Sequence, residues 1–515
     1  MAVLLITGTR MSCAEMFSDS RCIACHPNEV AGFARSAMAH SLTETAALPT
    51  GSFEHVFSGT RFSVRTSAAG IVQELERGGE SSTQQVAYIV GSGTHAFGFL
   101  IQIGGHLFQS PISYYSKART WDMAPGYEEV SNPDFSRPVT PECLLCHSGQ
   151  PEPVEDTLNT YKATPFLQKS ISCERCHGSA ESHLKNPIPG SIVNPARLAR
   201  AVRDSICEQC HLRGEIRIPN PGQTIGDFRP GQSIEHVYTI YVANRAENGT
   251  VKVISHSEQL ALSACARQSG GKLWCGTCHN PHAGSAPTAS FFRSRCLSCH
   301  GATLENSHAK PGRDCVGCHM PRLPARDGGH TAFTDHRIRR RPEDSIPPLQ
   351  TGMAAWREPD PAFRQRNLAL ALVASGLLHQ SPADLSRGYQ MLNGVENQFP
   401  NDRDVLTSLG SVELRIGRPG EALRRFVKAL SLRPNCASYE VNAAAALIQL
   451  GNDSEAIRHL HTALKLDPLL QPAVTMLSSL YRERGQPGPE EQIIADYRRA
   501  MAIVDDSKKP QRTSQ

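Results

Sequence analysis

Hydrophobic and polar residues alternate over residues 50 to 120. The stretches FEHVFSGTRFSVRTS, QQVAYIVGSG and HAFGFLIQIGGHLFQSPI are rich in β-branched and aromatic residues, and Gly-Ser and Gly-Gly turns separate them. A period of two places alternate side chains on opposite faces of a strand. The pattern predicts a small antiparallel sheet at about 50–120, inserted into a larger domain.

A different pattern runs from residue 363 to residue 505. Glycines and prolines recur there every 34 residues, namely Gly417, Gly451 and Gly485, and Pro400, Pro434 and Pro468. This period is typical of tetratricopeptide (TPR) repeats, in which each unit is a pair of helices. Three units are predicted, at 403–436, 437–470 and 471–504, with a degenerate fourth unit at about 363–400.

The segments around these two regions have weaker patterns. Residues 140–340 show little apolar periodicity, and short helices and loops are predicted there. A proline-rich stretch at 341–362 indicates a linker, residues 506–515 form a polar tail, and residues 1–12 resemble a vestigial or truncated signal segment. The domain boundaries that follow are 13–340 and 363–505.

The composition argues against a nucleic-acid-binding protein and against a protein with membrane-spanning helices. The 515 residues carry a net charge of +4, from 53 basic and 49 acidic side chains, so bulk charge does not indicate binding to nucleic acid. No stretch approaches the roughly 18 apolar residues that a membrane helix needs. Association with a membrane through partner proteins stays open.

The cysteines form one repeated motif. Fourteen of the seventeen cysteines lie in seven Cys-x-x-Cys-His pentapeptides, the signature of covalent haem c attachment. In each pentapeptide two thiols reach the two vinyl groups of one porphyrin, and the histidine that follows becomes the proximal iron ligand. The expected attachment residues are Cys22, Cys25, Cys143, Cys146, Cys173, Cys176, Cys207, Cys210, Cys275, Cys278, Cys296, Cys299, Cys315 and Cys318. The expected proximal ligands are His26, His147, His177, His211, His279, His300 and His319.

Other uses of paired cysteines fit the pattern less well. Zinc sites also use Cys-x-x-Cys pairs, but they have no reason to place a histidine after every pair. A thioredoxin-like redox site needs one such motif rather than seven. Seven haems would also supply much of the apolar core that residues 140–340 lack. The expected fold is therefore multidomain: a haem-rich, mostly α and loop cytochrome domain with a small antiparallel β insertion, followed by an all-α TPR solenoid.

Seven irons can take seven further ligands, and the chain has 21 histidines. Bis-histidine ligation favours low-spin iron and a lower potential than Met/His ligation. Histidines that follow a motif closely, such as His183 and His282, cannot easily fold back onto their own iron and are expected to ligate a neighbouring haem. The candidates for distal ligation are His40, His55, His95, His183, His256, His282, His308, His330 and His336.

The first 340 residues resemble the cytochrome c-554-related multihaem family, in the versions fused to TPR repeats. The resemblance rests on YIVGSGTHAFGFL, WDMAPGYEE, SRPVTPECLLCH, HSEQLALSACARQSGGKLWCGTCHNPH and DCVGCHMP followed by HTAFTDHRI. It implies a closely spaced chain of mostly bis-histidine haems that carries electrons. His106 occupies a turn where the family does not call for histidine, so it is not expected to be a ligand.

These observations lead to one functional hypothesis and one alternative. The hypothesis is an exported, periplasmic c-type cytochrome that transfers electrons along seven haems to redox partner proteins, while its repeats dock a partner protein or peptide. The alternative is a multihaem oxidoreductase that acts on a small nitrogen or sulfur species at one open-coordinate haem. The Cys-x-x-Cys-Lys variant that marks the active haem of related nitrite reductases does not occur in the sequence.

Overall fold

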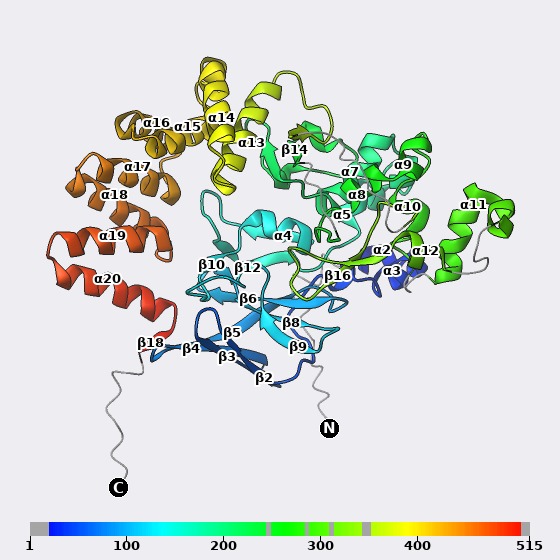
Figure 1. Cartoon of the computed structure of the whole chain (residues 1–515), viewed down its shortest axis with the longest axis horizontal. Helices are drawn as coiled ribbons and strands as arrows, with labels where there is room; N and C mark the ends of the chain where they lie inside the picture. Colours follow the sequence, from blue (N-terminus) through cyan, green and yellow to red (C-terminus); the bar gives the residue numbers. More distant parts are fainter. Residues whose placement is uncertain are drawn as a thin grey trace, which may run out of the picture.

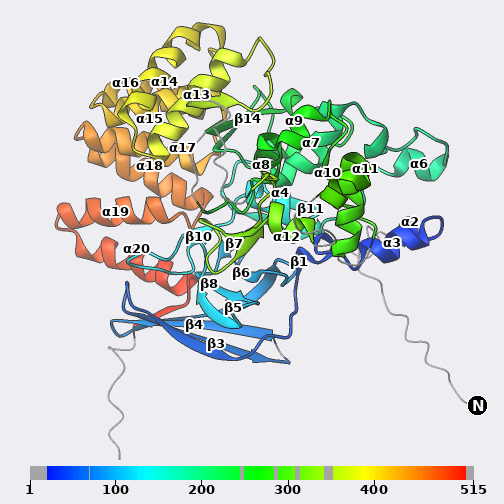
Figure 2. The ribbon, with the colours of Figure 1, turned by 45° about the vertical axis from the view of Figure 1, so that its right-hand side comes forward.

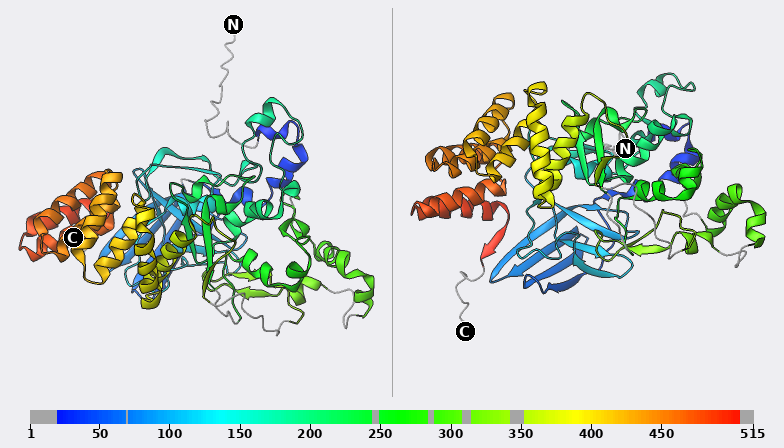
Figure 3. Two further views of the ribbon diagram at one scale, coloured as in Figure 1. Left: turned by 90° about the horizontal axis from the view of Figure 1, so that it is seen from above. Right: turned by 45° about the horizontal axis from the view of Figure 1, so that its top comes forward.

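The computed structural model describes residues 20–68, 70–243, 249–283, 288–307, 314–341 and 352–505. The described chain forms a large antiparallel sheet, a group of short helices and an arc of paired helices (Figure 1). The arc begins beside the short helices, and its far end returns to the sheet (Figure 2). Seen from above, the orange and red helices of the last helix pairs and the green helices near residue 300 lie at opposite ends of the molecule (Figure 3).

The sheet has eleven strands, ten from the N-terminal region and one from the C-terminal end. Its main path runs β10-β7-β6-β5-β4-β3-β2, with β1 and β18 paired to β5, and β8 paired to β6 and β9. The strands are β1 (Leu42–Thr43), β2 (Gly51–His55), β3 (Thr60–Ser67), β4 (Gly70–Arg77), β5 (Glu80–Val90), β6 (Ala96–Ile103), β7 (His106–Gln109), β8 (Ile112–Tyr115), β9 (Thr120–Met123), β10 (Arg137–Pro138) and β18 (Ile503–Asp505).

The alternation that predicted strands is also the burial pattern of the sheet. On β3 the side chains of Thr60, Phe62 and Val64 are buried, and the residues between them face outward or are half-buried. Phe62 and Val64 join a core with residues such as Ile101 and Ile112, all fully buried. The sheet therefore has an apolar core of its own that needs no cofactor.

The expected fold class is wrong in this respect. A haem-rich, mostly α and loop domain with a small β insertion was predicted, whereas a large antiparallel sheet organises the N-terminal region. The prediction treated bound porphyrins as the main source of apolar core. It also missed β1, β10 and β18, which are two or three residues long and join the sheet through pairing distant in sequence.

Short helices and three small sheets follow the large sheet in the chain. The small sheets pair β11 (Gln150–Pro153) with β12 (Tyr161–Gln168), β13 (Ile216–Pro219) with β14 (Tyr238–Ala243) and β17 (Met353–Ala355), and β15 (Arg322–Pro324) with β16 (Ala332–Thr334). The helices, including two before the large sheet, are α2 (Ser20–Ile23), α3 (Pro27–Phe33), α4 (Pro141–His147), α5 (Glu174–His177), α6 (Glu181–Lys185), α7 (Arg200–His211), α8 (His256–Leu262), α9 (Ala264–Gln268), α10 (Cys275–Cys278), α11 (Ala289–Ser307) and α12 (Cys315–His319).

The C-terminal region consists of helix pairs, which confirms its expected helical character. The pairs are α13 (Arg364–Leu378) with α14 (Pro382–Val395), α15 (Arg403–Arg415) with α16 (Pro419–Leu432), α17 (Ala437–Gln449) with α18 (Asp453–Leu466), and α19 (Gln471–Glu483) with α20 (Pro487–Ala500).

Small residues are needed where the helices of a pair meet. Gly417, at φ 75°, lies in the left-handed region in the turn after α15, a conformation that favours glycine. A Cβ atom on Gly410 would lie 2.6 Å from the ring of Phe426, which is fully buried. The repeating glycines and alanines of the sequence thus allow close helix packing.

The first helix pair is attached to the region of short helices. Arg366 on α13 is almost fully buried, and its guanidinium bonds Asp402 at 2.7 Å and the carbonyl oxygen of Pro219 at 2.7 Å. Part of the expected linker is also ordered structure, because Met353–Ala355 forms β17 and pairs with β14. Residues 342–351 of that expected linker lie outside the described residues.

Candidate functional site

Each Cys-x-x-Cys-His motif lies on or beside a short helical segment. A helical turn places residues three apart on one face, so both thiols of a motif can approach the same group. The turn is closed by the histidine amide: His26 donates to the carbonyl of Cys22 at 2.8 Å, His177 to Cys173 at 2.9 Å and His279 to Cys275 at 2.9 Å. The motifs occupy the end of α2, α4, α5, the end of α7, α10 with the residue after it, α11 and α12.

The motif cysteines are available for covalent attachment. All fourteen lie in the described chain, none is in a disulfide, and each is exposed or half-buried. The nearby Cys210 and the guanidinium of Arg217 lower the pKa of the Cys146 thiol. Since the thiolate is the nucleophilic form of cysteine, this environment favours reaction at Cys146.

Residues of different motifs contact one another directly. Arg21, next to the first motif, bonds Glu174 of the third at 3.1 Å. The guanidinium of Arg175 in the third motif donates to the carbonyl of Leu145 in the second at 2.7 Å, and the backbone carbonyl of Arg175 accepts from the Gln209 side chain of the fourth at 3.0 Å.

Cysteines that lie close together link the fourth motif to the fifth, sixth and seventh. Cys275 of the fifth motif lies close enough to Cys207 of the fourth to raise the pKa of the Cys207 thiol, and burial together with Cys315 of the seventh motif raises the pKa of Cys296 of the sixth. Cys278 of the fifth motif is close enough to Cys296 for its charge to raise the pKa of that thiol. The seven motifs, widely spaced in the sequence, therefore form one contiguous group.

Three motif histidines lie beside a histidine that was predicted as a distal ligand. The ring centroids of His26 and His183 are 6.4 Å apart, and those of His177 and His282 are 5.9 Å apart. The third pair, His279 and His336, has a centroid separation of 6.2 Å. Two imidazoles that bind one metal ion from opposite sides would have centroids roughly 6 Å apart, because each metal–nitrogen bond is about 2 Å long. The centroid separations of these pairs match that of two imidazoles bound to one metal ion.

Hydrogen bonds fix the ring nitrogens of several of these histidines. The Nδ1 of His177 bonds the carbonyl of Val193 at 2.8 Å, and the Nδ1 of His336 bonds the carbonyl of Thr334 at 2.9 Å. A carbonyl only accepts, so Nδ1 carries the proton and Nε2 has the lone pair. That tautomer is suited to binding a metal through Nε2.

A fourth group of histidines surrounds His256. Its ring lies 5.4 Å from that of the motif residue His211 and 4.9 Å from that of His336. Burial and these neighbouring imidazoles lower the pKa of His256 to about 3, which keeps its ring neutral. The Nδ1 atoms of His256 and His95 are buried and have no hydrogen-bond partner in the described structure. His95 also stacks on Phe333 at 4.3 Å.

Three other predicted ligands have their Nε2 atom engaged by protein groups. The Nε2 of His40 bonds the carbonyl of Ala34 at 2.9 Å, and that of His55 bonds the carbonyl of Glu128 at 2.9 Å. The exposed His330 bonds the Asp122 carboxylate at 2.7 Å. His308 lies outside the described residues. The structure therefore brings His183, His256, His282 and His336 to motif histidines, whereas these three bond other groups.

Apolar side chains near the motifs are exposed to an unusual degree. Ile23, inside the first motif, is 50% exposed, and Leu184, beside His183, is 46% exposed. Such residues suit contact with the flat apolar face of a porphyrin. The cysteine thiols outside disulfides, the paired imidazoles and these side chains together fit haem c.

Two features of this region were missed in the sequence. Phe333, between His330 and His336, contacts both His95 and His256, and the HTAFTDH stretch that contains it was considered only for its histidines. Glu208, inside the fourth motif, is buried and accepts a hydrogen bond from Trp356 at 3.1 Å. Its position between two cysteines gave no signal of that role.

Within the described chain, no three His, Cys, Asp or Glu side chains gather as a metal-ion site. A haem iron takes four ligands from its porphyrin and at most two from protein, so haem sites are not of that kind. In the same part of the chain, no helix is both long and apolar enough to cross a membrane.

Comparison with known proteins identifies a short stretch of the N-terminal region. The family described as cytochrome c554 and c-prime matches residues 113–178, which contain the second and third Cys-x-x-Cys-His motifs. The chain is thus similar to c-type cytochromes over this stretch, a similarity that indicates haem c and a role in electron transfer.

The other similarities are partial. The TPR repeat-containing thioredoxin TTL4 of Arabidopsis thaliana is 35% identical over 86 residues, which are 17% of this chain and 13% of that protein. An O-GlcNAc transferase of Thermobaculum terrenum is 25% identical over 26% of each chain, with a TM-score of 0.24. The protein MamA of MSR-1 is 22% identical over 27% of this chain and 75% of its own, with a TM-score of 0.23.

Proposed function

We propose that this chain is an exported c-type cytochrome that binds seven haems covalently and transfers electrons along them. One observation carries the proposal: motifs far apart in the sequence form a single group through contacts such as Arg21–Glu174 and Arg175–Leu145. Each covalently bound haem would supply a one-electron Fe(III)/Fe(II) couple. Because haem c is attached outside the cytoplasmic membrane, the proposed location is the periplasm or another exported site.

The proposal assigns axial pairs to the histidines that lie together. His183 would hold the haem of the first motif together with His26, His282 that of the third with His177, and His336 that of the fifth with His279. His256, beside His211, is assigned to the fourth motif. In two of these pairs the extra histidine closely follows another motif: His183 follows the third motif and is assigned to the first, and His282 follows the fifth and is assigned to the third.

Haem content and spin state test the proposal. The full chain, produced with a haem c maturation system, should contain seven haems per chain by pyridine haemochrome assay, and the ferric protein should give only low-spin EPR signals. A chain without covalent haem would contradict the proposal. One high-spin haem that responds to nitrite, hydroxylamine or sulfite would instead support the oxidoreductase alternative.

A single replacement tests an assigned pair. His183→Ala should keep seven haems, because attachment depends on the cysteines, and should convert one haem to a high-spin or altered EPR signal. His236→Ala is the matched control, since His236 is exposed on a short turn and has no assigned role. Unchanged low-spin signals in both variants would remove His183 from the ligand set.

We also propose that the helical repeats dock a redox partner protein. Solenoids of helix pairs present extended surfaces for other proteins. Ile416 and Leu450 hold equivalent positions in successive repeats, and they are 49% and 46% exposed. Replacing both by aspartate should slow reduction of the full chain by a periplasmic extract of its host, with the haem spectrum unchanged. An unchanged rate would contradict docking at this surface.

A further inference from the structure

One position of each repeat faces the N-terminal region. Phe399, Arg433 and Asp467 directly precede the prolines at 400, 434 and 468, and Met501 continues the spacing of 34 residues. Each follows the second helix of its pair closely, or a short turn after it. We call these four residues the turn edge of the repeats.

Three residues of the turn edge contact the N-terminal part of the chain directly, and the fourth, Phe399, lies on an apolar cluster that includes N-terminal residues. Phe399 packs against the apolar cluster that contains Ile218 and Tyr241 of β13 and β14. Arg433 forms ion pairs with Asp156 and Glu155, at the tip of the β11–β12 hairpin.

The other two contacts reach the large sheet. Asp467, 3% exposed, bonds the Nε2 of His106 on β7 at 3.0 Å. The carbonyl oxygen of Met501 accepts hydrogen bonds from Gln84 at 2.6 Å and from Ser82 at 3.3 Å, both on β5. The three direct contacts are thus ionic or hydrogen-bonding, although the repeat position is the same.

Apolar burial accompanies the polar contacts. Leu158, near the hairpin tip, packs against the core shared by α17, α18 and α19. From the other side, Leu469 and Met501 are buried in the core of the large sheet, and Tyr497 packs against it. Burial on both sides distinguishes this interface from a chance approach of two surfaces.

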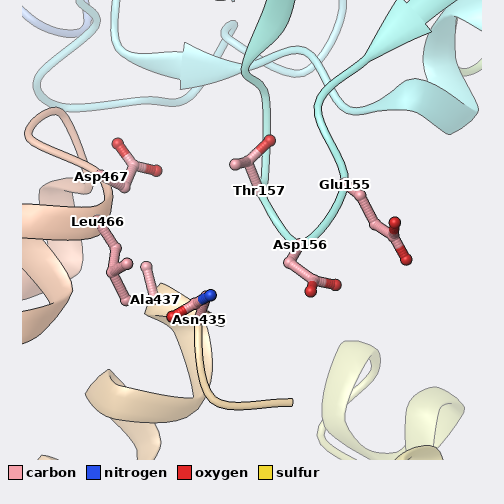
Figure 4. A pocket seen from close by; sticks show the side chains of 7 residues that line it. All are labelled: Glu155, Asp156, Thr157, Asn435, Ala437, Leu466 and Asp467. Atoms are coloured by element: carbon pink, nitrogen blue, oxygen red, sulfur yellow. The ribbon is translucent and has the colours of Figure 1, made fainter.

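The hairpin tip and the repeats border a cleft of about 390 Å³. Figure 4 shows the tip, with Asp156, reaching toward the turn that carries Asn435 and Ala437. Asp156 has a φ of 65°, a left-handed conformation that costs free energy for a residue other than glycine. Such a conformation persists where surrounding contacts hold it, and the ion pair with Arg433 is one of them.

We propose that the turn edge is an intramolecular binding surface whose ligand is the chain's own N-terminal region. Through it the repeats hold the β11–β12 hairpin and strand β5 in place. The hairpin joins the second motif, which ends at His147, to the third, which begins at Cys173. The repeats therefore fix the separation of these two motifs, a consequence for the haems that rests on the proposed function, whereas the binding itself does not.

Hydrogen exchange of the full, haem-loaded chain tests the proposal. Arg433→Ala should raise the amide exchange rate of residues 152–160 at least about fivefold, the change expected when a charged contact that closes a local structure is lost. Arg418→Ala is the matched control, because Arg418 belongs to the same repeat and, among the described residues, forms an ion pair only with the nearby Glu421, on an exposed turn. Equal effects of the two replacements, or no effect of Arg433→Ala, would overturn the proposal.

A second variant tests another turn-edge contact and guards against a failure of the first to fold. His106→Leu removes the partner of Asp467, and faster exchange is expected at residues 467–470 with little change around the hairpin tip. Unaltered exchange at 467–470 would contradict the proposal. Both exchange measurements are independent of haem. A chain without haem would therefore contradict the proposed function but would not affect this test. Where haem is present, Arg433→Ala should also shift haem midpoint potentials with haem content unchanged.

Discussion

The indole nitrogen of Trp356 donates a hydrogen bond to the carboxylate of Glu208 at 3.1 Å. Arg357, the next residue, forms an ion pair with the same carboxylate and a second one with Glu235 at 2.9 Å. Glu208 lies between the two cysteines of the fourth motif. The segment before the repeats is therefore bonded directly to a candidate haem-attachment helix.

Arg357→Ala should destabilise the protein by about 3 kcal/mol, because it leaves the buried Glu208 carboxylate without its cationic partner. Urea unfolding followed by circular dichroism measures the change. Arg364→Ala is the control, since the ion pair of Arg364 with Glu358 is exposed and should contribute less than about 1 kcal/mol. A similar small loss for both variants would show that Glu208 does not depend on Arg357.

Two glycines of one repeat should respond oppositely to alanine. Gly410→Ala places a Cβ atom 2.6 Å from the Phe426 ring, so it should cost about 1–3 kcal/mol although alanine favours helices. Gly420→Ala meets no atom within 4 Å and should be neutral or stabilising by up to about 1 kcal/mol. Thermal unfolding of the two variants measures both, and a stable Gly410→Ala protein would contradict the close helix packing.

Ala502→Gly should stabilise the chain by about 0.5–1 kcal/mol. Ala502 has a φ of 51°, between the end of α20 and β18, and glycine adopts this conformation without the steric cost that alanine meets. The gain is partial because glycine also loses more backbone entropy on folding. Ala495→Gly, in the interior of α20, should instead cost about 1 kcal/mol. Urea midpoints compare the two, and destabilisation by Ala502→Gly would argue against strain at this turn.

Stability should fall at alkaline pH in part through Tyr497. Burial against the sheet and the nearby Asp134 raise the pKa of its hydroxyl to about 12, above the value of about 10 in an unfolded chain. Because folding favours the protonated form, this contribution is fully present below pH 10 and is lost as pH rises toward 12. Its size is at most about 2 kcal/mol, given partial exposure.

Tyr497→Phe removes that titration. Relative to this variant, the natural protein should lose stability between about pH 10 and pH 12 and show no pH-dependent difference below pH 10. Tyr481→Phe, a replacement that packs within the repeats, is the control. Parallel pH dependence of the natural protein and Tyr497→Phe would show that the phenol is not held by the sheet.

Local signals were read correctly where the structure is locally determined. Alternation identified strands such as β3, because buried residues alternate with exposed or half-buried ones from Thr60 to Arg65. The glycine and proline spacing identified the helix pairs, since those residues end helices at fixed points. Neither signal contains information on partners distant in sequence.

The wrong predictions arise because local patterns contain no information on partners distant in sequence. His106 was set aside for lack of a family role, and its bond to Asp467 crosses 361 residues of sequence. The extent of the sheet was missed because two-residue strands such as β1 have no pattern of their own. At the motifs, sequence spacing indicated that His183 and His282 would reach neighbouring attachment sites, but not that His26 and His177 would be those neighbours.

Strand β18 pairs with β5 through Ile503 opposite Ser82 and Asp505 opposite Glu80. Ser82 also bonds Met501, 419 residues away in sequence. During synthesis the N-terminal strands emerge first, so this edge of β5 has no partner until the repeats have been made. Contacts of such long sequence separation form slowly, and an unpaired strand edge can recruit another chain. Newly made chains should therefore be most prone to aggregation before the repeats close on the sheet.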